Sequence, residues 1–301
     1  MIRLGTRGSK LALAQARLVA DRLAGLGANV EIVVVTTTGD RSTSSLPDSS
    51  ATGIFVKELE AELARGNMDL AVHSLKDLPT DVPEGLTLAA VPARGSALDA
   101  LVCRQRGMTL DDLAPGARVG TSSPRRRAQI LHYRRDLEMR PVRGNLDTRL
   151  RKLDAGEFEA IVVAHAGLER LELSETLPHV LAPEVCLPAP GQGALALEIR
   201  ADDGRAAELV QALDDADTCA CVTAERALLK ALGGGCRAAV GALAQVRGGA
   251  LRLDGVVADT DGRRLLRGAV EGTPRDAQAL GAALARDLQE RGAGALIEAA
   301  R

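Results

Sequence analysis

The first part of the chain alternates short apolar runs with longer segments in which apolar side chains recur every three or four positions. The short runs are rich in β-branched residues and predict strands, whereas the longer segments have the periodicity of amphipathic helices. Ser9 precedes the first helix and is expected to cap it. Strands are expected at 2–6, 30–36 and 69–74, and helices at 10–26 and 54–65. This alternation predicts an α/β fold with a largely parallel sheet.

A second series of strands and helices begins near Gly95 and Ser96, where the chain is expected to cross into another domain. One strand is predicted before this crossing, at 86–91. Four more are predicted after it, at 100–103, 118–121, 137–142 and 160–164. Two helices are interleaved with the later strands, one ending near residue 132 and one over 146–155. After a turn at 190–193, a strand at 194–199 is expected to return to the first sheet.

The pattern changes again beyond residue 215, where one helix precedes three strand-like runs and a closing helix. These elements are predicted at 218–232, 239–246, 250–258, 264–271 and 275–291. They indicate a small α+β domain. We therefore expect three domains, formed by residues 1–95 with 193–214, by residues 96–192, and by residues 215–301.

Composition narrows the class of protein. The formal net charge is −2, so the chain as a whole has no attraction for nucleic acid or for an anionic membrane. No run approaches the ~18 consecutive apolar residues of a membrane span, and no export signal precedes the first strand. Five cysteines, an odd number, favour reduced thiols and a cytoplasmic location. No Cys or His pair has the spacing of a zinc site, so we expect no metal.

Arginine is concentrated in residues 118–151, which hold ten arginines against three acidic residues. Arg125 and Arg126 follow the sequence Gly-Thr-Ser-Ser where a strand is expected to meet a helix. Backbone N–H groups and the helix dipole favour an anion there, and arginine forks add bidentate recognition of carboxylate or phosphate. The pattern predicts a polyanionic ligand. Nucleic acid is disfavoured, because Tyr133 is the only aromatic residue of the interval on which a base could stack.

Two further features suggest chemistry. Lys76 and Asp77 follow a predicted buried strand, and ligands of open α/β sheets bind beyond the carboxyl ends of strands. A solvated ion pair at a strand end is the alternative interpretation.

Glycines at 233–235 end the helix that begins near 218 and place Cys236 in a loop, since glycine adopts left-handed backbone without a Cβ penalty. That thiol is either an inert residue beside a helix cap or a reactive group.

Six sequence blocks together resemble the hydroxymethylbilane synthase family, also called porphobilinogen deaminase. In chain order they are 7–15 (RGSKLALAQ), 73–79 (HSLKDLP), 120–126 (GTSSPRR), 143–149 (RGNLDTR), 190–193 (PGQG) and 234–236 (GGC). The blocks fall in the family's order and span almost the whole chain, so the set is highly specific.

The resemblance implies an α/β fold with two lobes similar to type II periplasmic binding proteins and a small α+β C-terminal domain. It implies a transferase that joins four porphobilinogen molecules head to tail, with release of ammonia, into the linear tetrapyrrole hydroxymethylbilane. This step belongs to tetrapyrrole biosynthesis, which includes porphyrin and heme. The family carries a dipyrromethane cofactor, assembled from the substrate and held by a thioether to the loop cysteine. We expect a cytoplasmic monomer that binds neither nucleic acid nor membrane.

The resemblance also implies roles for individual residues. Asp77 matches the catalytic carboxylate, which would stabilise positive charge near the pyrrole nitrogen and move protons. Cys236 matches the covalent anchor of the cofactor, and further cofactor contacts are implied for Lys76, Ser123, Arg125, Arg126 and Arg149. Contacts with incoming substrate or the growing chain are implied for Arg7, Ser9, Arg143 and Arg170. Supporting or backbone-shaping roles are implied for Gln15, Thr121, Ser122, Asn145 and Gln192.

The serine-rich segment 39–53 departs from the family. Its length predicts a lid-like loop. Many members have Gly-Lys-Gly before the phenylalanine that matches Phe55, whereas this chain has Ser-Ala-Thr-Gly at 50–53, so we assign no lid residue.

The main alternative function is a non-catalytic two-lobed receptor for polyanions. Such a receptor would explain the α/β units and the arginines, but it would not explain the cysteine loop.

Overall fold

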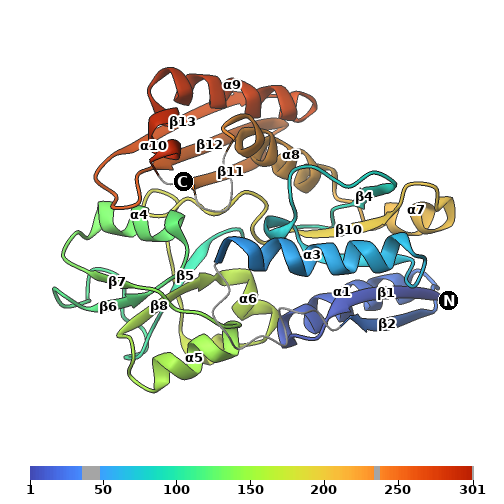
Figure 1. Cartoon of the computed structure of the whole chain (residues 1–301), viewed down its shortest axis with the longest axis horizontal. Helices are drawn as coiled ribbons and strands as arrows, with labels where there is room; N and C mark the ends of the chain where they lie inside the picture. Colours follow the sequence, from blue (N-terminus) through green and yellow to red (C-terminus); the bar gives the residue numbers. More distant parts are fainter. Residues whose placement is uncertain (36–47, 234–237, 300–301) are drawn as a thin grey trace. The chain divides into compact units, whose positions relative to one another are not determined.

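The computed structural model describes residues 1–35, 48–233 and 238–299, and for 48–55 it describes the backbone alone. The chain forms two compact units, each of which contains two separate stretches of sequence (Figure 1). The first consists of Met1–Gly95 with Gly193–Cys219, and the second of Ser96–Gln192 with Ala220–Arg301.

The first unit is built on a five-stranded sheet with the order β2-β1-β3-β10-β4. Its strands are β1 (Ile2–Arg7), β2 (Val30–Val35), β3 (Leu70–Ser74), β4 (Leu86–Ala90) and β10 (Leu195–Arg200). β1 pairs in parallel with β2 and β3, whereas β10 lies antiparallel between β3 and β4. Four strands therefore run one way and only β10 runs the other way. The expected largely parallel sheet, and the return of the 194–199 strand to it, are confirmed.

Alternation along β3 decides which helix each of its side chains meets. Leu70 and Val72 face α1 (Lys10–Gly25) and α7 (Gly204–Gln211), with which they share an apolar cluster. Ala71 points to the other face, where it packs against Leu59 and Leu63 of α3 (Asp48–Ala64). Both faces of the sheet are therefore covered, as in other α/β folds.

Helix α3 begins earlier than the sequence pattern indicated. Its first residue is Asp48, so the expected loop at 39–53 is wrong for residues 48–53, which are helical. An acidic residue and serines suit the first turn of a helix, although they add nothing to its apolar periodicity. The remainder of that expected loop, residues 39–47, lies outside the described residues.

The second unit repeats this plan. Its five-stranded sheet has the order β7-β6-β8-β5-β9, and the reversed strand is β5, which follows the crossing at Ser96. The strands are β5 (Asp99–Cys103), β6 (Arg118–Gly120), β7 (Glu138–Arg140), β8 (Ala160–Ala164) and β9 (His179–Val180). Helices α4 (Pro124–Tyr133) and α5 (Leu146–Asp154) pack on opposite faces, and α6 (His165–Arg170) follows β8. Helices α6 and α7 were not predicted, because six and eight residues are too few to show the helical period, and neither was β9, which has two residues.

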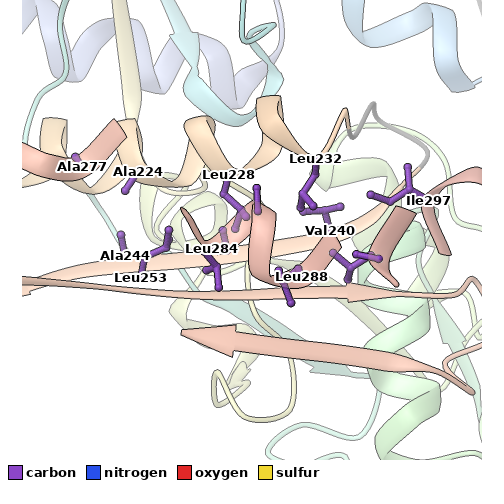
Figure 2. Close-up of a cluster of buried hydrophobic side chains, with 14 of the residues drawn as sticks. Ala224, Leu228, Leu232, Val240, Ala244, Leu253, Ala277, Leu284, Leu288 and Ile297 are labelled. Carbon is purple, nitrogen blue, oxygen red and sulfur yellow. The ribbon is translucent and has the colours of Figure 1, made fainter. Parts of the chain in front are cut away.

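The C-terminal part of the second unit is an antiparallel sheet of three strands, β11 (Ala239–Arg247), β12 (Ala250–Ala258) and β13 (Leu265–Gly272). Helices α8 (Ala216–Ala231), α9 (Ala277–Glu290) and α10 (Ala293–Glu298) cover it through one aliphatic cluster (Figure 2). Helices α8 and α9 approach closely at Gly281. A Cβ added there would lie 2.4 Å from the carbonyl oxygen of Ala224. The expected small α+β domain is confirmed.

This α+β part packs directly on α4. Ala128 of α4 shares a buried cluster with Ala239 and Ala258, and Nδ1 of His132 lies 2.9 Å from the carbonyl oxygen of Gly262. Arg267 of β13 donates to the carbonyl oxygens of Pro183 and Glu184 at 3.0 and 2.7 Å. These contacts explain why residues 220–301 belong to the same compact unit as residues 96–192.

Candidate functional site

In the first unit, the predicted site residues gather at the carboxyl ends of β1 and β3, which are neighbouring parallel strands. Arg7 is the last residue of β1, and Ser9 caps α1 by accepting a hydrogen bond from the backbone N–H of Ala12 at 3.3 Å. Lys76 and Asp77 lie in the single 3₁₀ turn η1 (Leu75–Asp77) that follows β3, and both are exposed. This edge therefore presents a carboxylate, cationic side chains and a capped helix N-terminus, a combination suited to an anionic ligand with a polar reacting group.

The turn that carries Asp77 starts from a strand end held on several sides. The side-chain nitrogen of Gln15, on α1, donates to Oγ of Ser74 at 2.9 Å. The backbone N–H of Leu75 donates to the carbonyl oxygen of Ala194 at 3.1 Å. On the opposite face of the sheet, Nε2 of His73 lies 3.1 Å from Oε2 of Glu198. The supporting role implied for Gln15 therefore has a specific contact, which fixes the residue two positions before Lys76.

In the second unit, the predicted residues lie at the carboxyl ends of β6 and β7 and at the N-termini of the helices that follow. Ser123 caps α4 by accepting from the backbone N–H of Arg126 at 3.4 Å, and Asn145 caps α5 by accepting from Thr148 at 3.0 Å. Oγ of Ser122 donates to the carbonyl oxygen of Val142 at 2.9 Å. The short loops after these strands are thus fixed by their own side chains.

Three more of the predicted arginines belong to this unit. Arg143 is exposed just before α5. Arg149 is half-buried within α5, and its Nε donates to the carbonyl oxygen of Gly144 at 2.9 Å. Arg170 ends α6, the helix that follows β8. Two helix N-termini and cationic side chains on one unit form a donor set whose chemistry suits carboxylates, as a dipyrromethane with acetate and propionate arms would need.

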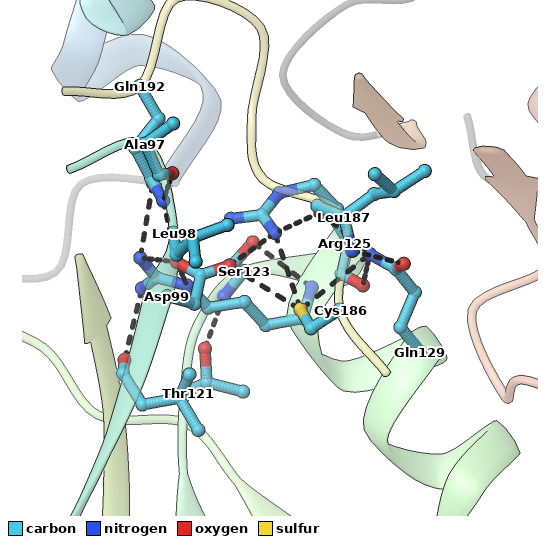
Figure 3. A network of polar contacts seen from close by, with 12 residues as sticks. Ala97, Leu98, Asp99, Thr121, Ser123, Arg125, Gln129, Cys186, Leu187 and Gln192 are labelled. Carbon is cyan, nitrogen blue, oxygen red and sulfur yellow. Dashed lines mark hydrogen bonds and ion pairs between the residues drawn. The ribbon is translucent and has the colours of Figure 1, made fainter. Parts of the chain in front are cut away.

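Arg125 and Arg126 occupy a different environment from the one their sequence position indicated. Both side chains are buried, with residue exposures of 5% and 6%, and both bind the fully buried carboxylate of Asp99 on β5 (Figure 3). Nη1 of Arg125 lies 2.6 Å from Oδ2, and Nη2 of Arg126 lies 2.7 Å from Oδ1. Arg125 also donates to the carbonyl oxygen of Leu187 at 2.7 Å. The described contacts of these arginines are with the protein itself, and their implied role as cofactor contacts stays a prediction.

The charges of this network support one another. Burial opposes ionisation of Asp99, but the positive charges of Arg125 and Arg126 outweigh it and hold the pKa of Asp99 well below its ordinary value. Cys186 lies in the same network, with its sulfur 3.4 Å from Oδ2 of Asp99. Burial, reinforced by the Asp99 charge, raises the pKa of the Cys186 thiol to about 12. This cysteine is therefore a protonated structural residue and not a nucleophile.

Gln192 connects the network to the turn at 190–193. Its side-chain nitrogen donates to the carbonyl oxygen of Ala97 at 2.8 Å and to Oδ1 of Asp99 at 2.9 Å. The neighbouring backbone N–H of Gly191 donates to Oε2 of Glu225 at 2.7 Å. Sequence reasoning missed Asp99 and Glu225. A signal existed for Asp99, because it stands in the buried run Asp-Ala-Leu-Val-Cys, and a charge in such a strand needs a buried partner.

Cys236 lies outside the described residues, so the structure places neither the predicted anchor nor Arg237 beside it. The other predicted residues divide between the two compact units. Arg7, Ser9, Gln15, Lys76 and Asp77 belong to the first unit. Thr121, Ser122, Ser123, Arg125, Arg126, Arg143, Asn145, Arg149, Arg170 and Gln192 belong to the second.

The part of the chain that the structure describes lacks two features of other classes of protein. No helix in this part of the chain is both long and apolar enough to span a bilayer. Across residues 1–35, 48–233 and 238–299, no group of three or more His, Cys, Asp or Glu side chains is arranged to hold a metal ion.

Fold and site define a protein with two α/β units, each presenting cationic side chains and capped helix N-termini at the carboxyl ends of its strands. Two family models match almost the whole chain. "Porphobilinogen deaminase, dipyromethane cofactor binding domain" matches residues 2–208, and "Porphobilinogen deaminase, C-terminal domain" matches residues 219–290. The chain belongs to the porphobilinogen deaminase family.

Curated relatives agree with this assignment over more than nine tenths of their lengths. The chain is 50% identical to the porphobilinogen deaminase of Pelotomaculum thermopropionicum, with 100% of this chain and 97% of the relative aligned. It is 52% identical to the porphobilinogen deaminase of Acidothermus cellulolyticus, over 99% of this chain and 92% of the relative. The corresponding protein of Mycobacterium avium is 48% identical, over 100% and 98%.

Solved structures with a similar arrangement include a nutrient-binding protein from Burkholderia cenocepacia bound to methionine. It aligns with 71% of this chain and 91% of its own, at 14% identity and a TM-score of 0.43. A periplasmic binding protein of an ABC transporter from Brucella ovis, with glutathione bound, aligns with 77% and 68% at a TM-score of 0.42 and 17% identity. No functional conclusion follows from likenesses at these scores.

Proposed function

We propose that this protein is a hydroxymethylbilane synthase, which joins four porphobilinogen molecules head to tail with release of ammonia. The observation that carries the proposal is the match of both porphobilinogen deaminase domains, over residues 2–208 and 219–290. The structure agrees with this chemistry, because a carboxylate stands at the strand ends of one unit and carboxylate-binding groups stand at those of the other. The enzyme is a transferase of tetrapyrrole biosynthesis.

Asp77 is the residue we assign to catalysis. It is exposed on η1, directly after a strand of the central sheet, so it is presented by a rigid element and not by a long loop. A carboxylate in this position can accept the N–H of a pyrrole ring and stabilise the positive charge that develops on that ring during condensation. It can also receive the proton that the attacking ring loses.

The remaining residues bind and orient carboxylates. Porphobilinogen carries an acetate and a propionate, so each added ring brings two further carboxylates to the site. Arg7, Ser9, Arg143 and Arg170 bind the incoming substrate or the growing chain in this proposal. Lys76, Ser123, Arg125, Arg126 and Arg149 hold the cofactor in this proposal, Arg125 and Arg126 while they also bind Asp99.

The family's dipyrromethane cofactor supplies a covalently held terminal pyrrole to which substrate units are joined. We assign its anchor to Cys236. We further propose that the enzyme is a cytoplasmic monomer that needs no metal ion.

Intact-mass measurement of the purified protein tests the proposal. The enzyme is expected to weigh more than its sequence by two pyrrole units, to place that mass on the peptide containing Cys236, and to give a colour with Ehrlich's reagent. Supplied with porphobilinogen, it should release ammonia and form a tetrapyrrole. A protein that binds polyanions but gains no mass after incubation with porphobilinogen, and turns none over, would instead be the non-catalytic receptor.

Two cysteine variants sharpen the mass experiment. Cys236→Ala is expected to give a folded protein without the added mass and without activity. Cys219→Ser is the matched control, since Cys219 lies on α8, the helix that precedes the cysteine loop. This control should keep both the added mass and the activity. Retained mass in Cys236→Ala would place the anchor elsewhere.

Size-exclusion chromatography with light scattering tests whether the protein is a monomer. Incubation with a chelator tests whether its activity is independent of metal ions.

A further inference from the structure

Three ionisable side chains lie buried together in the first unit, and the assigned roles use none of them. They are His73 on β3, Glu198 on β10 and Glu60 on α3, with residue exposures of 7%, 0% and 8%. Nε2 of His73 lies 3.1 Å from Oε2 of Glu198. The other oxygen of Glu198, Oε1, is buried without a hydrogen-bond partner in the described part of the chain.

Sheet geometry brings this group together. In the antiparallel pairing of β3 with β10, His73 stands opposite Ala196, and Glu198 stands opposite Ala71. Glu198 is two residues from Ala196, so it projects from the same face of the sheet as His73. This is the face covered by α3, which contributes Glu60.

Such an arrangement costs stability. Burial raises the pKa of Glu60, and the neighbouring charge of Glu198 raises it further. Replacing both partners of a buried polar contact by apolar groups of similar shape can be nearly neutral or stabilising, so stability alone gives little reason to keep polar groups here. His73 and Glu198 provide a directional contact between the two strands, which aliphatic side chains cannot provide.

The contact between His73 and Glu198 lies near the end of β3, close in sequence to Asp77. His73, Ser74 and Leu75 are consecutive, and each is tied to a different partner. His73 meets Glu198 at 3.1 Å, Ser74 meets Gln15 at 2.9 Å, and the N–H of Leu75 meets the carbonyl oxygen of Ala194 at 3.1 Å. The next two residues are Lys76 and Asp77, which lie in η1 with no intervening loop. A shift at the end of β3 is therefore transmitted directly to the Asp77 carboxylate.

We propose that His73 and Glu198 are positioning residues that fix the end of β3 and thereby orient the Asp77 carboxylate toward the reacting pyrrole. The inference rests on the proposed function, in which Asp77 is the catalytic group. Neither residue contacts substrate, so their loss affects turnover and not binding. Misplacement of a catalytic group by about 1 Å can cost up to ~100-fold in rate.

The test uses variants of the holoenzyme whose cofactor content is confirmed by intact mass. The double variant His73→Leu/Glu198→Leu replaces the pair by apolar residues and should fold with a thermal midpoint close to that of the wild type. We expect its kcat to fall by about 10- to 100-fold with KM changed by less than about threefold, because only the orientation of Asp77 is lost. Wild-type turnover in this stable double variant would overturn the proposal.

Conservative variants supply the second readout, and they remain informative if the double variant does not fold. Glu198→Gln keeps an oxygen for Nε2 of His73, and His73→Gln keeps a donor for Glu198. Both should therefore retain kcat within about threefold of the wild type, since a hydrogen bond between the two side chains survives. A fall as large as that of the apolar double variant would contradict a positioning role based on this contact.

A control pair that joins β1 to the start of β3 separates positioning from general damage to the sheet. Arg3 and Asp69 form an ion pair with Nη2 and Oδ1 2.7 Å apart, at the opposite end of β3 from Asp77. Asp69→Asn should lower the thermal midpoint and leave kcat unchanged. A wild-type protein without added mass or activity would count against the proposed function, whereas active wild type with unaffected variants would count against the positioning role alone.

Discussion

Nη2 of Arg126 and Oδ1 of Asp99 lie 2.7 Å apart inside the second unit, while Oδ2 of the same carboxylate lies 2.6 Å from Nη1 of Arg125. One buried carboxylate thus pairs with two consecutive arginines. Asp99 begins β5 and the arginines lie in the first turn of α4, so the pairs fasten that turn to the sheet. The N-terminus of α4 is held in place for the carboxylates it is proposed to bind.

Asp99→Asn should be one of the most damaging single substitutions in the second unit. It removes one charge and leaves two guanidinium groups buried without their counter-ion, which in buried pairs costs about 3–5 kcal/mol of unfolding free energy. Urea unfolding at pH 7 measures the loss. Asp136→Asn is the control, because Asp136 pairs with Arg134 at a more exposed site and should cost about 1 kcal/mol or less. Similar losses in the two variants would show that burial does not strengthen the Asp99 contacts.

The contribution of Asp99 should also depend on pH in a definite direction. Its pKa is lower in the folded protein than in the unfolded chain, where an ordinary aspartate has a value of about 3.9. The stability it contributes is therefore complete above that value and is lost as the pH falls below it. The difference in unfolding free energy between wild type and Asp99→Asn should be constant from about pH 6 to 8 and shrink below about pH 4. A difference that grew on acidification would contradict the ionised state.

Cys186 and Cys103 should be unreactive in the native protein. Burial raises the pKa of the Cys186 thiol to about 12 and that of Cys103 to about 11, and both side chains are inaccessible. Since the thiolate is the reactive form, iodoacetamide at pH 8 should leave both unmodified until denaturant is added. Peptide mapping by mass spectrometry checks this. Modification of Cys186 without loss of structure would mean that the Asp99 network opens readily.

Gly281→Ala should destabilise the C-terminal α+β part. An added Cβ would lie 2.4 Å from the carbonyl oxygen of Ala224 and 2.6 Å from Cβ of Ala227, so α9 would have to move away from α8. Overpacking of this kind typically costs about 1–3 kcal/mol. Gly294→Ala on α10 is the matched control, because nothing lies within 4 Å of the added atom. Thermal unfolding should show a lower midpoint for Gly281→Ala and an equal or higher one for Gly294→Ala.

Asp77→Asn tests the assigned catalytic carboxylate. The amide keeps the shape of the side chain but can neither accept a proton at neutral pH nor balance a positive charge, so kcat should fall by about 100-fold or more. Added mass on the cofactor peptide should persist in protein purified from cells. The control is Glu84→Gln, an exposed carboxylate seven residues further along the chain, which should leave kcat unchanged. Near-normal turnover by Asp77→Asn would remove Asp77 from its role.

Much of the fold could be predicted from the sequence because its elements are long and strongly patterned. Strands β8 and β12 have the expected bounds, and β11 and β13 end within one residue of them, since β-branched and apolar runs recur with few interruptions. The start of α3 could not be predicted, because Asp48 and the serines after it mark a helix terminus without any apolar period. Helix α6, with six residues, and strand β9, with two, carry too little pattern to be recognised.

By itself the sequence determined the fold class, the family and the place of Asp77 at the end of a strand, because these depend on local pattern and on motifs in a fixed order. Only the tertiary structure decided what the side chains of those motifs contact. Arg125 and Arg126 read as exposed forks at a helix N-terminus, yet they are buried against Asp99, 26 and 27 residues away. His73 meets Glu198 across 125 residues. The physical reason is common to both: burial makes a charge costly, and its partner comes from whichever strand the sheet topology brings beside it.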